Sequence, residues 1–308
     1  MSNENWLITG IEGFVGSHFF SALQQRGYAV FGTTWIKTLA DEKNIFYLDL
    51  SQAEQINLLM QKIKPRYLAL IAGFSSMRDS FQKREECLTI NYHSTRYFLE
   101  AIRKHKLKTK VLIISSAMMY CPSDEILTEA SAVCNSSPYA ESKIKQEQLI
   151  KEFPEIEIVA SRSFNHTGPG QLDSFIVPKL AKGFAEAEKN NKEVVEFELG
   201  DIDSERDFLD VRDVCNAYRI LLEEPTKHDI YNVCSSQCFS VRKIISILEK
   251  KIGKKARIMI NKSFINSNER KLILGDNKRI ITETSWKPAI PFEQTVHDTY
   301  LYWKKKMY

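Results

Sequence analysis

The sequence predicts an α/β protein in which a doubly wound parallel sheet is joined to a smaller, discontinuous C-terminal lobe. In the first half, short apolar runs alternate with amphipathic stretches, as strands alternate with helices in such a sheet. A glycine-rich turn lies between the first strand and the first helix, within 16 residues of the N-terminus. After the apolar run at 156–165 the alternation becomes less regular, which indicates the second lobe.

The elements of the first half follow from their apolar patterns. Helices are expected at 15–27, ended by Gly27, at 51–64, capped by Ser51, at about 85–104, and through the segment Tyr139–Phe153. Buried strands are expected at 5–10, 28–34, 44–50, 67–73 and 110–116.

The second half gives fewer elements. The segment 166–171 contains two glycines and a proline and breaks the pattern. Strands are expected at 156–165 and 229–236. Helices are expected at 175–190, with Pro178 in its first turn or before it, at 240–253, closed by Gly253, and at the end of 285–303. We expect a nucleotide-binding domain formed by residues 1–165 plus about 205–240. Residues 166–204 and 241–308 would form the substrate lobe.

Composition excludes several classes of protein. With 43% hydrophobic and 27% charged residues and a net charge of +4, the chain is typical of a globular protein without a basic stripe for nucleic acid. No apolar run reaches the ~18 residues that span a membrane, and the N-terminus does not resemble a signal peptide. Six scattered cysteines without a CxxC pair predict reduced thiols and no metal site. We therefore expect a cytoplasmic protein.

The first turn carries a candidate phosphate cradle. Gly10, Gly13 and Gly16 are spaced three apart between the first strand and the first helix. Glycine lets the backbone turn tightly and approach a pyrophosphate, while the helix N-terminus supplies free N–H groups. The spacing and its place in the chain predict a dinucleotide site. Its further contacts are expected from Phe14, Val15, Leu50, Ala72, Gly73 and Ser75.

The end of the second strand bears on the cofactor. An acidic residue there favours NAD, but this chain has Thr33, Thr34 and Trp35, with Lys37 close by. Hydroxyls and a cation suit a 2′-phosphate, so NADP(H) is favoured and NAD(H) remains the alternative. Asp49 is placed to reach the adenine.

A serine, a tyrosine and a lysine form the candidate catalytic set. Tyr139 and Lys143 are four positions apart, which places them on the same face of a helix. Free tyrosine has a pKa near 10, and we expect the nearby ammonium to lower it toward neutral pH. Ser116 ends a strand, where ligands bind in parallel sheets. Its hydroxyl could orient a substrate carbonyl while Tyr139 protonates it.

With these motifs the chain resembles the extended short-chain dehydrogenase/reductases over nearly its whole length. The residues that carry the resemblance are "TGIEGFVG", "SSAMMY", "YAESK" and "SWKP". Within the nucleotide-sugar group it is most similar to GDP-6-deoxy-4-keto-mannose reductases, on "RSFNHTGPGQ" (162–171), "ERDFLDVRDV" (205–214), "IYNVCSS" (230–236) and "LGDNKRI" (274–280). The resemblance implies a Rossmann-type domain and a homodimer formed through the helices Glu85–Lys104 and Tyr139–Phe153.

The resemblance also implies roles for single residues. Asn165 would line the sugar pocket, with Phe164 and His166 near the nicotinamide. Arg206 would face the pyrophosphate of the sugar nucleotide and Glu269 its ribose. From residue type alone, Arg206 is a surface ion-pair partner and His166 a core histidine. Further substrate contacts are expected from Ser76, Met118, Lys179 and Arg270.

The chain departs from the family in two places. Relatives usually have an arginine and a proline before the glutamate, where this chain has Asn266. Arg270 could compensate for that arginine. The segment "MMYC" also lacks the glycine that often follows its tyrosine.

The residue two positions before Tyr120 distinguishes the reactions of the family. Similar 4,6-dehydratases have glutamate there and GDP-fucose synthases have cysteine, whereas this chain has Met118. Dehydration and epimerisation at C3 or C5 need an acid or base beyond the tyrosine. We therefore predict reduction of a GDP-linked 4-keto-6-deoxy sugar, hexose or heptose, at C4. A C4 epimerase or 4-oxidase with tightly bound NAD, and a non-catalytic NADP-binding protein, are the alternatives.

Overall fold

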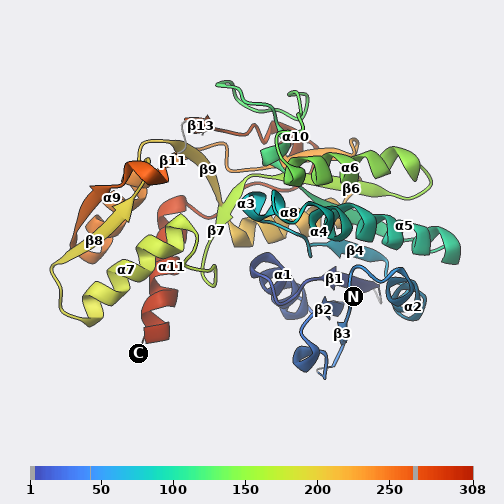
Figure 1. Ribbon diagram of the computed structural model, residues 1–308. Helices are drawn as coiled ribbons and strands as arrows, with labels where there is room; N and C mark the ends of the chain where they lie inside the picture. The colour runs from blue at the N-terminus through green and yellow to red at the C-terminus, as the bar shows by residue number, and fades with distance from the viewer. Residues whose placement is uncertain (1–3, 42, 266–269, 308) are drawn as a thin grey trace.

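The computed structural model describes residues 4–41, 43–265 and 270–307, and a parallel sheet of seven strands organises its larger part (Figure 1). The strand order is β10-β6-β5-β4-β1-β2-β3, and all neighbours in this sheet are parallel. This order reverses between β1 and β4, as in doubly wound folds. The strands are β1 (Asn5–Thr9), β2 (Ala29–Thr34), β3 (Ile45–Tyr47), β4 (Tyr67–Leu70), β5 (Lys110–Ser116), β6 (Ile158–Ser163) and β10 (Ile230–Val233).

Helices cover both faces of this sheet, so the predicted fold class is confirmed. Trp6 and Ile8 of β1 pack into the core beneath α1 (Phe14–Gln25) and α8 (Val211–Glu223). The intervening Leu7 packs into the core on the opposite face. That face is covered by α2 (Ala53–Ile63), α5 (Ser94–His105) and α6 (Pro138–Glu152). Alternate residues of one strand thus supply two separate cores, as the period of two requires.

The helix expected at about 85–104 is present, but it is not regular. It consists of α4 (Arg84–Leu88), a single π-helical turn (Thr89–His93) and α5. Such turns are rare and frequently lie at functional sites. Here the turn carries Asn91, which is 1% exposed.

The predicted cap of α2 is wrong. The helix begins at Ala53 and its N-cap residue is Gln52, without a side-chain hydrogen bond. Ser51 instead donates its hydroxyl hydrogen bond to Asp49, at 2.7 Å. A serine caps a helix through its oxygen, and the Ser51 oxygen accepts from the Gln52 Nε2 at 3.0 Å instead of from a backbone N–H of the helix. Asp49 also accepts from the Ser51 N–H at 2.9 Å.

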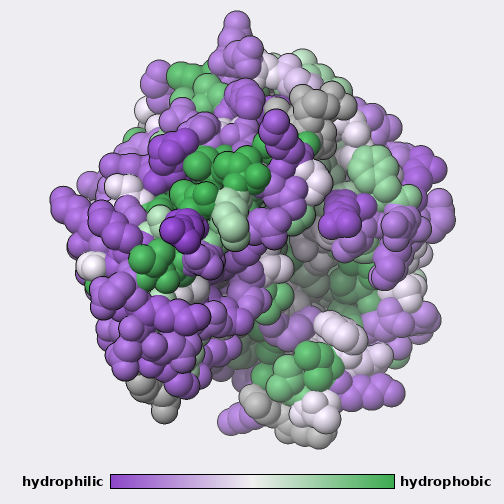
Figure 2. Space-filling model, turned by 60° about the vertical axis from the view of Figure 1, so that its left-hand side comes forward, coloured by the Kyte–Doolittle hydropathy of each residue, from purple (hydrophilic) through white to green (hydrophobic). Residues whose placement is uncertain are grey.

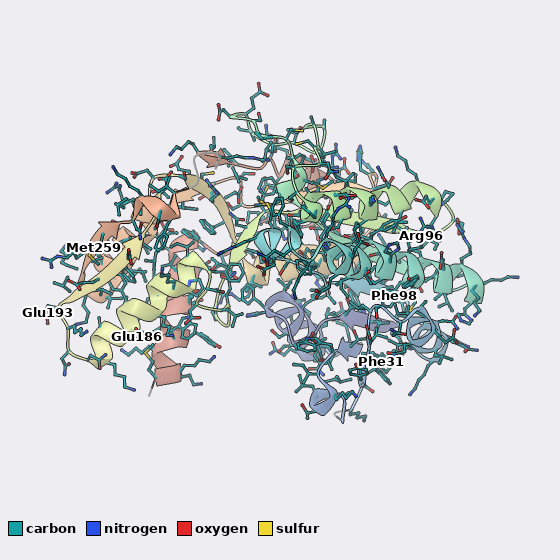
Figure 3. All side chains as sticks on the ribbon, in the orientation of Figure 1. Phe31, Arg96, Phe98, Glu186, Glu193 and Met259 are labelled. Atoms are coloured by element: carbon teal, nitrogen blue, oxygen red, sulfur yellow. The ribbon has the colours of Figure 1, made fainter. Side chains whose placement is uncertain are left out.

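The smaller lobe contains the three later helices predicted from the sequence. They are α7 (Ile176–Lys189), with Pro178 as its third residue, α9 (Val241–Ile252), closed by Gly253, and α11 (Phe292–Met307). A parallel pair of strands, β8 (Val194–Leu199) and β12 (Lys255–Ile260), completes this lobe. Figure 3 labels Glu186, Glu193 and Met259 on it, apart from Phe98 in the larger domain.

The expected strand at 156–165 is divided between two sheets. β6 ends at Ser163, and β7 (Asn165–Thr167) pairs with β9 (Glu205–Asp210) of a second sheet. The chain therefore leaves the main sheet within two residues, which an apolar run cannot reveal. The rest of this second sheet is β11 (Cys238–Ser240) and β13 (Leu272–Ile273), and the remaining short helices are α3 (Met77–Ser80) and α10 (Lys278–Glu283).

The outer surface is mainly hydrophilic, with smaller hydrophobic clusters, on the face that Figure 2 shows. Within the described residues, no helix has the length and apolar character needed to cross a membrane. The same part of the chain contains no cluster of three or more histidine, cysteine or acidic side chains arranged to hold a metal ion. The domain bounds expected from the sequence stay a prediction.

Candidate active site

Two glycines of the glycine-rich turn, Gly10 and Gly16, leave no room for a side chain. Gly10 has a φ of +70°, and a Cβ there would lie 2.8 Å from the Ala72 Cβ. A Cβ on Gly16 would overlap the carbonyl oxygen of Gly10. Gly13 precedes α1 as its N-cap, without a side-chain cap, and its N–H donates to the Gly10 carbonyl at 3.1 Å. The backbone of α1 is thereby exposed to a phosphate at its N-terminus, where the helix dipole favours negative charge.

The end of β2 presents the residues considered for the 2′-phosphate. Thr34 is buried and its hydroxyl accepts from the Ile36 N–H at 3.1 Å. Trp35 is 69% exposed, and the Lys37 Nζ lies 5.5 Å from the centroid of the Tyr47 ring. Hydrogen bonds from Ser51 lower the pKa of Asp49 below its ordinary value. The region at the end of β2 therefore combines the exposed indole of Trp35, the Lys37 cation and the ionised Asp49 carboxylate.

The segment after β4 lies against the glycine-rich turn. The Ala72 N–H donates to the carbonyl oxygen and the hydroxyl of Thr9, at 3.1 and 2.9 Å. Gly73 is exposed beside the Asn91 side chain, and Ser75 is exposed after it. Ser76 is the N-cap of α3 and accepts from the Asp79 N–H at 3.1 Å. The carboxyl ends of β1 and β4 thus meet at the reversal of strand order, where ligands bind in such sheets.

The three predicted catalytic residues come together at the carboxyl end of β5. Ser116 ends β5, and Tyr139 and Lys143 lie one turn apart on α6. Tyr139 is 9% exposed and Lys143 is 5% exposed. The Ser116 side chain hydrogen-bonds to Tyr139, and the Lys143 Nζ lies 5.9 Å from the centroid of the Tyr139 ring.

The pKa of Tyr139 differs from the sequence-based expectation. Burial raises it above the ordinary value, and the hydrogen bond with Ser116 lowers it only in part. Burial lowers the pKa of Lys143 to about 8, because its ammonium loses hydration, while Cys87 and Glu147 raise it. At neutral pH the phenol of Tyr139 is therefore protonated. The Lys143 amine beside it titrates near pH 8.

Asn91 is a site residue that the sequence analysis did not identify. Its side-chain oxygen accepts from the Phe74 N–H at 2.9 Å, and its Nδ2 donates to the Phe74 carbonyl at 3.1 Å. The same Nδ2 also donates to the Ser142 hydroxyl at 2.9 Å. It connects the loop after β4 to the catalytic helix. Only the π-helical turn places it there, and no spacing in the sequence predicts that turn.

An aromatic contact joins the glycine-rich turn to the segment after β6. The rings of Phe14 and His166 are stacked, with centroids 6.2 Å apart. Burial lowers the pKa of His166, so its imidazole is neutral at neutral pH. Its Nδ1 lies 3.0 Å from the Phe164 carbonyl oxygen and must be the protonated nitrogen, because a carbonyl only accepts. His18 on α1 also donates to the Pro169 carbonyl at 2.7 Å.

Met118 lies beside the catalytic serine on an apolar wall. Its N–H donates to the Ser116 hydroxyl at 3.2 Å. Its side chain packs against a buried cluster that includes Phe164. A thioether has no proton to give or take at this position, so only Tyr139 and Lys143 are ionisable among the predicted catalytic residues.

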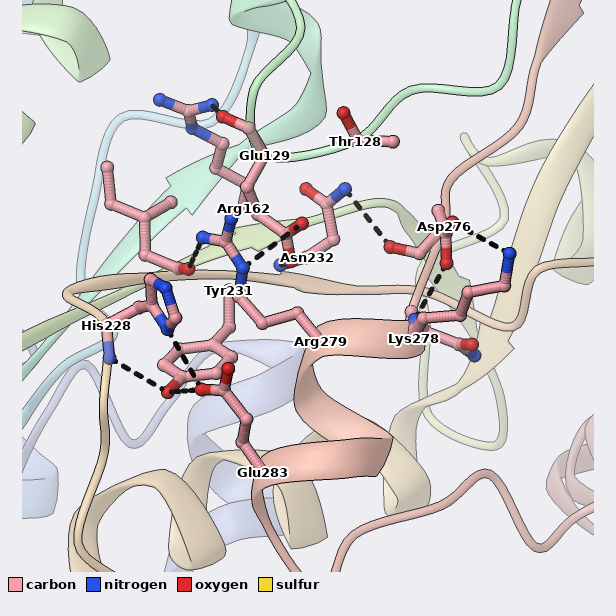
Figure 4. A network of polar contacts seen from close by, with 12 residues as sticks. Thr128, Glu129, Arg162, His228, Tyr231, Asn232, Asp276, Lys278, Arg279 and Glu283 are labelled. Carbon is pink, nitrogen blue, oxygen red and sulfur yellow. Dashed lines mark hydrogen bonds and ion pairs between the residues drawn. The ribbon is translucent and has the colours of Figure 1, made fainter.

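Arg162 and Asn232 belong to a polar network (Figure 4), in which Arg162 donates to the Glu129 carbonyl at 3.1 Å and Asn232 to the Asp276 carbonyl at 3.3 Å. Arg162 and Glu147 form a buried ion pair at 2.7 Å, and Arg162 also donates to the Tyr120 hydroxyl at 3.2 Å. Tyr120 in turn donates to Asn232 on β10, at 2.6 Å. Burial raises the pKa of Tyr120 to about 12, so this phenol acts as an anchor rather than as an acid at neutral pH.

Three of the predicted substrate residues, Asn165, Arg206 and Arg270, lie on or next to strands of the second sheet in the chain. Asn165 begins β7, and Arg206 on β9 donates to the Glu205 and Lys271 carbonyls, at 3.0 and 3.4 Å. Arg270 donates to the Tyr120 carbonyl. Its Nη1 is buried without a hydrogen-bond partner among the described residues.

For two other predicted contacts, Glu269 and Lys179, the structure gives no place in this group. Glu269 lies outside the described residues, as does Asn266. Lys179 is exposed on α7 and lines a groove of about 550 Å³ between α7 and β8. None of the three predicted catalytic residues lines that groove. The role of Lys179 therefore stays a prediction without structural support.

The Rossmann-type sheet, the glycine-rich turn and the Ser116, Tyr139 and Lys143 set define an extended short-chain dehydrogenase/reductase. Residues 7–299 match the family model described as GDP-mannose 4,6 dehydratase. The chain belongs to this family, which confirms the resemblance seen in the sequence. The family description does not fix the reaction of this member, which has Met118 where similar dehydratases have glutamate.

Curated relatives include enzymes that are not dehydratases. The chain is 29% identical to the GDP-6-deoxy-D-mannose reductase of Pseudomonas aeruginosa, covering 97% of each chain. It is 26% identical to the GDP-6-deoxy-D-talose 4-dehydrogenase of Aggregatibacter actinomycetemcomitans, covering 89% of each. These names support a nucleotide-sugar enzyme of deoxysugar metabolism.

Two solved structures of similar proteins have the same overall fold as this chain. RMD from Pseudomonas aeruginosa, complexed with NADPH, is 28% identical, with a TM-score of 0.86 and coverage of 99% of this chain and 98% of that chain. A protein described as a putative epimerase from Burkholderia cenocepacia is also 28% identical, with a TM-score of 0.89 and coverage of 98% of each chain.

Proposed function

We propose that this protein reduces a GDP-linked 4-keto-6-deoxy sugar, hexose or heptose, at C4, with NADP(H) as the cofactor. The observation that carries the proposal is the set of Ser116, Tyr139 and Lys143 with the uncharged Met118 beside it. This set can transfer one proton to a carbonyl but has no second acid or base for dehydration. The similarity to a GDP-6-deoxy-D-mannose reductase supports the same reaction. The pathway would be bacterial-type deoxysugar synthesis for a surface polysaccharide, in the cytoplasm.

The residues of the first turn fit a dinucleotide. Gly10 and Gly16 leave no room for side chains, so a pyrophosphate can approach the backbone at the start of α1. Lys37 and Thr34 suit the 2′-phosphate of NADP(H), and a relative of known structure is complexed with NADPH. NAD(H) is the alternative, since Thr34 and Trp35 do not exclude it. Phe14 and His166, stacked on each other, would border the nicotinamide.

The chemistry assigns one task to each catalytic side chain. The bound reduced nicotinamide would supply the hydride to C4. Ser116 donates a hydrogen bond that orients the substrate carbonyl, and Tyr139 passes its phenolic proton to the carbonyl oxygen. Lys143 stabilises the resulting phenolate with its ammonium. The protonated state of Tyr139 at neutral pH is the state that reduction requires.

The second lobe would hold the GDP-sugar. In this proposal residues 1–165 and about 205–240 bind the cofactor, and residues 166–204 and 241–308 bind the sugar nucleotide. Asn165 would contact the sugar and Arg206 the pyrophosphate, a role that suits a guanidinium fork. Arg270 would replace the arginine that relatives carry at position 266. Its buried Nη1 has no hydrogen-bond partner within the described part of the chain and could donate to the nucleotide. A homodimer through α4, α5 and α6 is also part of the proposal, and sedimentation as a monomer only would contradict it.

The test is oxidation of NADPH in the presence of GDP-4-keto-6-deoxy-mannose generated enzymatically, with NADH in a parallel reaction. Consumption of NADPH with formation of a GDP-6-deoxyhexose supports the reductase. Faster consumption of NADH would change the cofactor but keep the reaction. No consumption of either, by a folded protein that binds the cofactor, contradicts the proposal.

A 4-dehydrogenase or C4 epimerase is the second candidate, because a relative is named GDP-6-deoxy-D-talose 4-dehydrogenase. The same three residues serve oxidation of a 4-hydroxyl with NAD or NADP. A reduced nicotinamide that copurifies with the protein, together with turnover of GDP-sugars with a free 4-hydroxyl, would favour this candidate. Cofactor binding without turnover of any such sugar would leave a non-catalytic binding protein.

A further inference from the structure

The Lys143 ammonium is held by two protein acceptors. Its Nζ donates to the Ile114 carbonyl at 2.7 Å and to the Gln146 side-chain oxygen at 3.1 Å. A charged ammonium has three N–H donors, so one remains for the phenolic oxygen of Tyr139 or a ligand hydroxyl. The first acceptor is a backbone carbonyl of β5, which a side-chain substitution does not remove. The second depends on the identity of the side chain at position 146.

The orientation of the Gln146 amide is fixed by its other neighbours. Thr95 donates its only hydroxyl hydrogen to the Asn91 carbonyl, at 2.8 Å. The Thr95 oxygen must then accept from the Gln146 Nε2, which lies 2.8 Å away. With its NH₂ group directed at Thr95, the amide presents its carbonyl to Lys143. The order of donors and acceptors thus follows from the chemistry of the groups.

This chain of hydrogen bonds is inaccessible to water. Gln146 is 3% exposed, Thr95 1% and Asn91 1%. Burial of an amide costs free energy unless both of its ends are hydrogen-bonded, and here both are. The chain connects the π-helical turn, at Asn91, to the catalytic lysine on α6. Lys143 is therefore positioned from two elements besides its own helix.

We propose that Gln146 is a positioning residue for the reaction proposed above, whose carbonyl oxygen fixes the Lys143 side chain beside Tyr139 and stabilises its charged form. Gln146 acts through the lysine and does not itself touch the reacting atoms. The inference rests on the proposed reductase function for its kinetic consequence, but not for its structural one.

Few titratable groups face this centre. Tyr139 and Glu147 are on α6, Cys87 is on α4, and Tyr218 on α8 has its own pKa raised in part by Tyr139. Glu147 is already paired with Arg162 at 2.7 Å. A substitution at position 146 should therefore shift the pKa of Lys143 or Tyr139, with few other groups nearby to contribute.

The kinetic test compares Gln146→Met and Gln146→Glu with the wild type, using the pH dependence of kcat for reduction. Gln148→Leu, on the exposed side of the same helix, is the matched control. Reduction needs charged Lys143, so activity falls at high pH. Loss of the neutral acceptor in Gln146→Met should move this fall to lower pH by about one unit. The added carboxylate in Gln146→Glu should move it to higher pH, and Gln148→Leu should leave it in place.

A second measurement does not depend on turnover. Protein labelled at the lysine Cε atoms with ¹³C reports the charge of Lys143 by NMR, with a Lys143→Met variant to assign the signal. Titration midpoints that move in opposite directions in Gln146→Met and Gln146→Glu support the inference, even when the tested keto sugar is not a substrate. An unchanged midpoint in both variants, or shifts of the same sign in folded proteins, would overturn it. If Gln146→Glu does not fold, an unmoved midpoint in Gln146→Met overturns it alone.

Discussion

The Nζ atom of Lys143 lies 5.9 Å from the centroid of the Tyr139 ring, one turn away on α6. The two groups respond to the same burial in opposite directions, since the pKa of the phenol rises and that of the amine falls to about 8. Both shifts favour the neutral form of the group. The pair is therefore suited to hold a transferable proton on Tyr139 until a substrate carbonyl accepts it.

Replacement of Tyr139 by phenylalanine should remove the proton donor and leave the fold intact. Positioned acids contribute roughly 10²- to 10⁴-fold to such reactions, and kcat for reduction should fall by that order. NADPH affinity, followed by fluorescence quenching, should stay near the wild-type value. Tyr302→Phe on α11 serves as the control. Turnover close to normal in Tyr139→Phe would refute the proposed mechanism.

Stability should depend on pH through Lys143. Its pKa is about 8 in the folded protein and 10.5 without burial, so between these values the unfolded chain binds more protons. The free energy of unfolding should therefore gain a contribution from this group as pH rises from about 8 to 10.5. Below about pH 8 both states are charged and the contribution is absent. Urea unfolding of wild type and Lys143→Met across this window should show a smaller rise in the variant, and parallel curves would contradict the assignment.

Two glycines of the first turn should respond differently to alanine. A Cβ on Gly16 overlaps the Gly10 carbonyl, whereas one on Gly13 lies 3.3 Å from the same oxygen. Gly16→Ala should lower the thermal unfolding temperature strongly, because backbone has to shift. Gly13→Ala should fold nearly normally and bind NADPH more weakly, since its methyl group narrows the approach to α1. Equal thermal stability of the two variants would show that the turn is less tightly packed than described.

Cofactor preference is predicted to depend on Lys37. A cation near the 2′-phosphate contributes about 1.4 kcal/mol in a partly exposed site, so Lys37→Ala should raise the KM for NADPH about tenfold. The KM for NADH should hardly change. Lys43→Ala, an exposed lysine a few residues further along the chain, is the control for lost positive charge. An equal rise for both cofactors would place Lys37 away from the 2′-phosphate.

Some features of the site could be anticipated from spacing alone. The three glycines and the YxxxK pattern are local, because a single turn and a single helix fix the relative positions of their members. Ser116 could be placed because the carboxyl ends of parallel strands meet at one edge. The confirmed helices at 176–189 and 241–252 likewise follow from amphipathic repeats and end signals such as Gly253.

Other features could not be anticipated, because they arise from contacts between distant segments. Asn91 reaches the site only through a π-helical turn inside a helix whose pattern looks regular. The transfer of the chain from β6 to β7 depends on pairing with β9, which lies some forty residues later. The cap expected at Ser51 is absent because the helix begins at Ala53, and the Ser51 oxygen accepts from the Gln52 side chain instead.

By itself the sequence determined the alternation of strands and helices in the first half, the glycine-rich turn, the spacing of the candidate catalytic residues and the absence of an ionisable group at Met118. Each of these depends on residue type and short-range spacing, which the chain carries without folding. Tertiary structure alone decided the protonation of the site. The pKa of Tyr139 was expected to fall toward neutral pH, yet it rises, because burial removes water from the phenolate and the hydrogen bond with Ser116 offsets only part of that cost. It also decided that Gln146 faces the lysine, since that orientation depends on Thr95 and Asn91 from another helix.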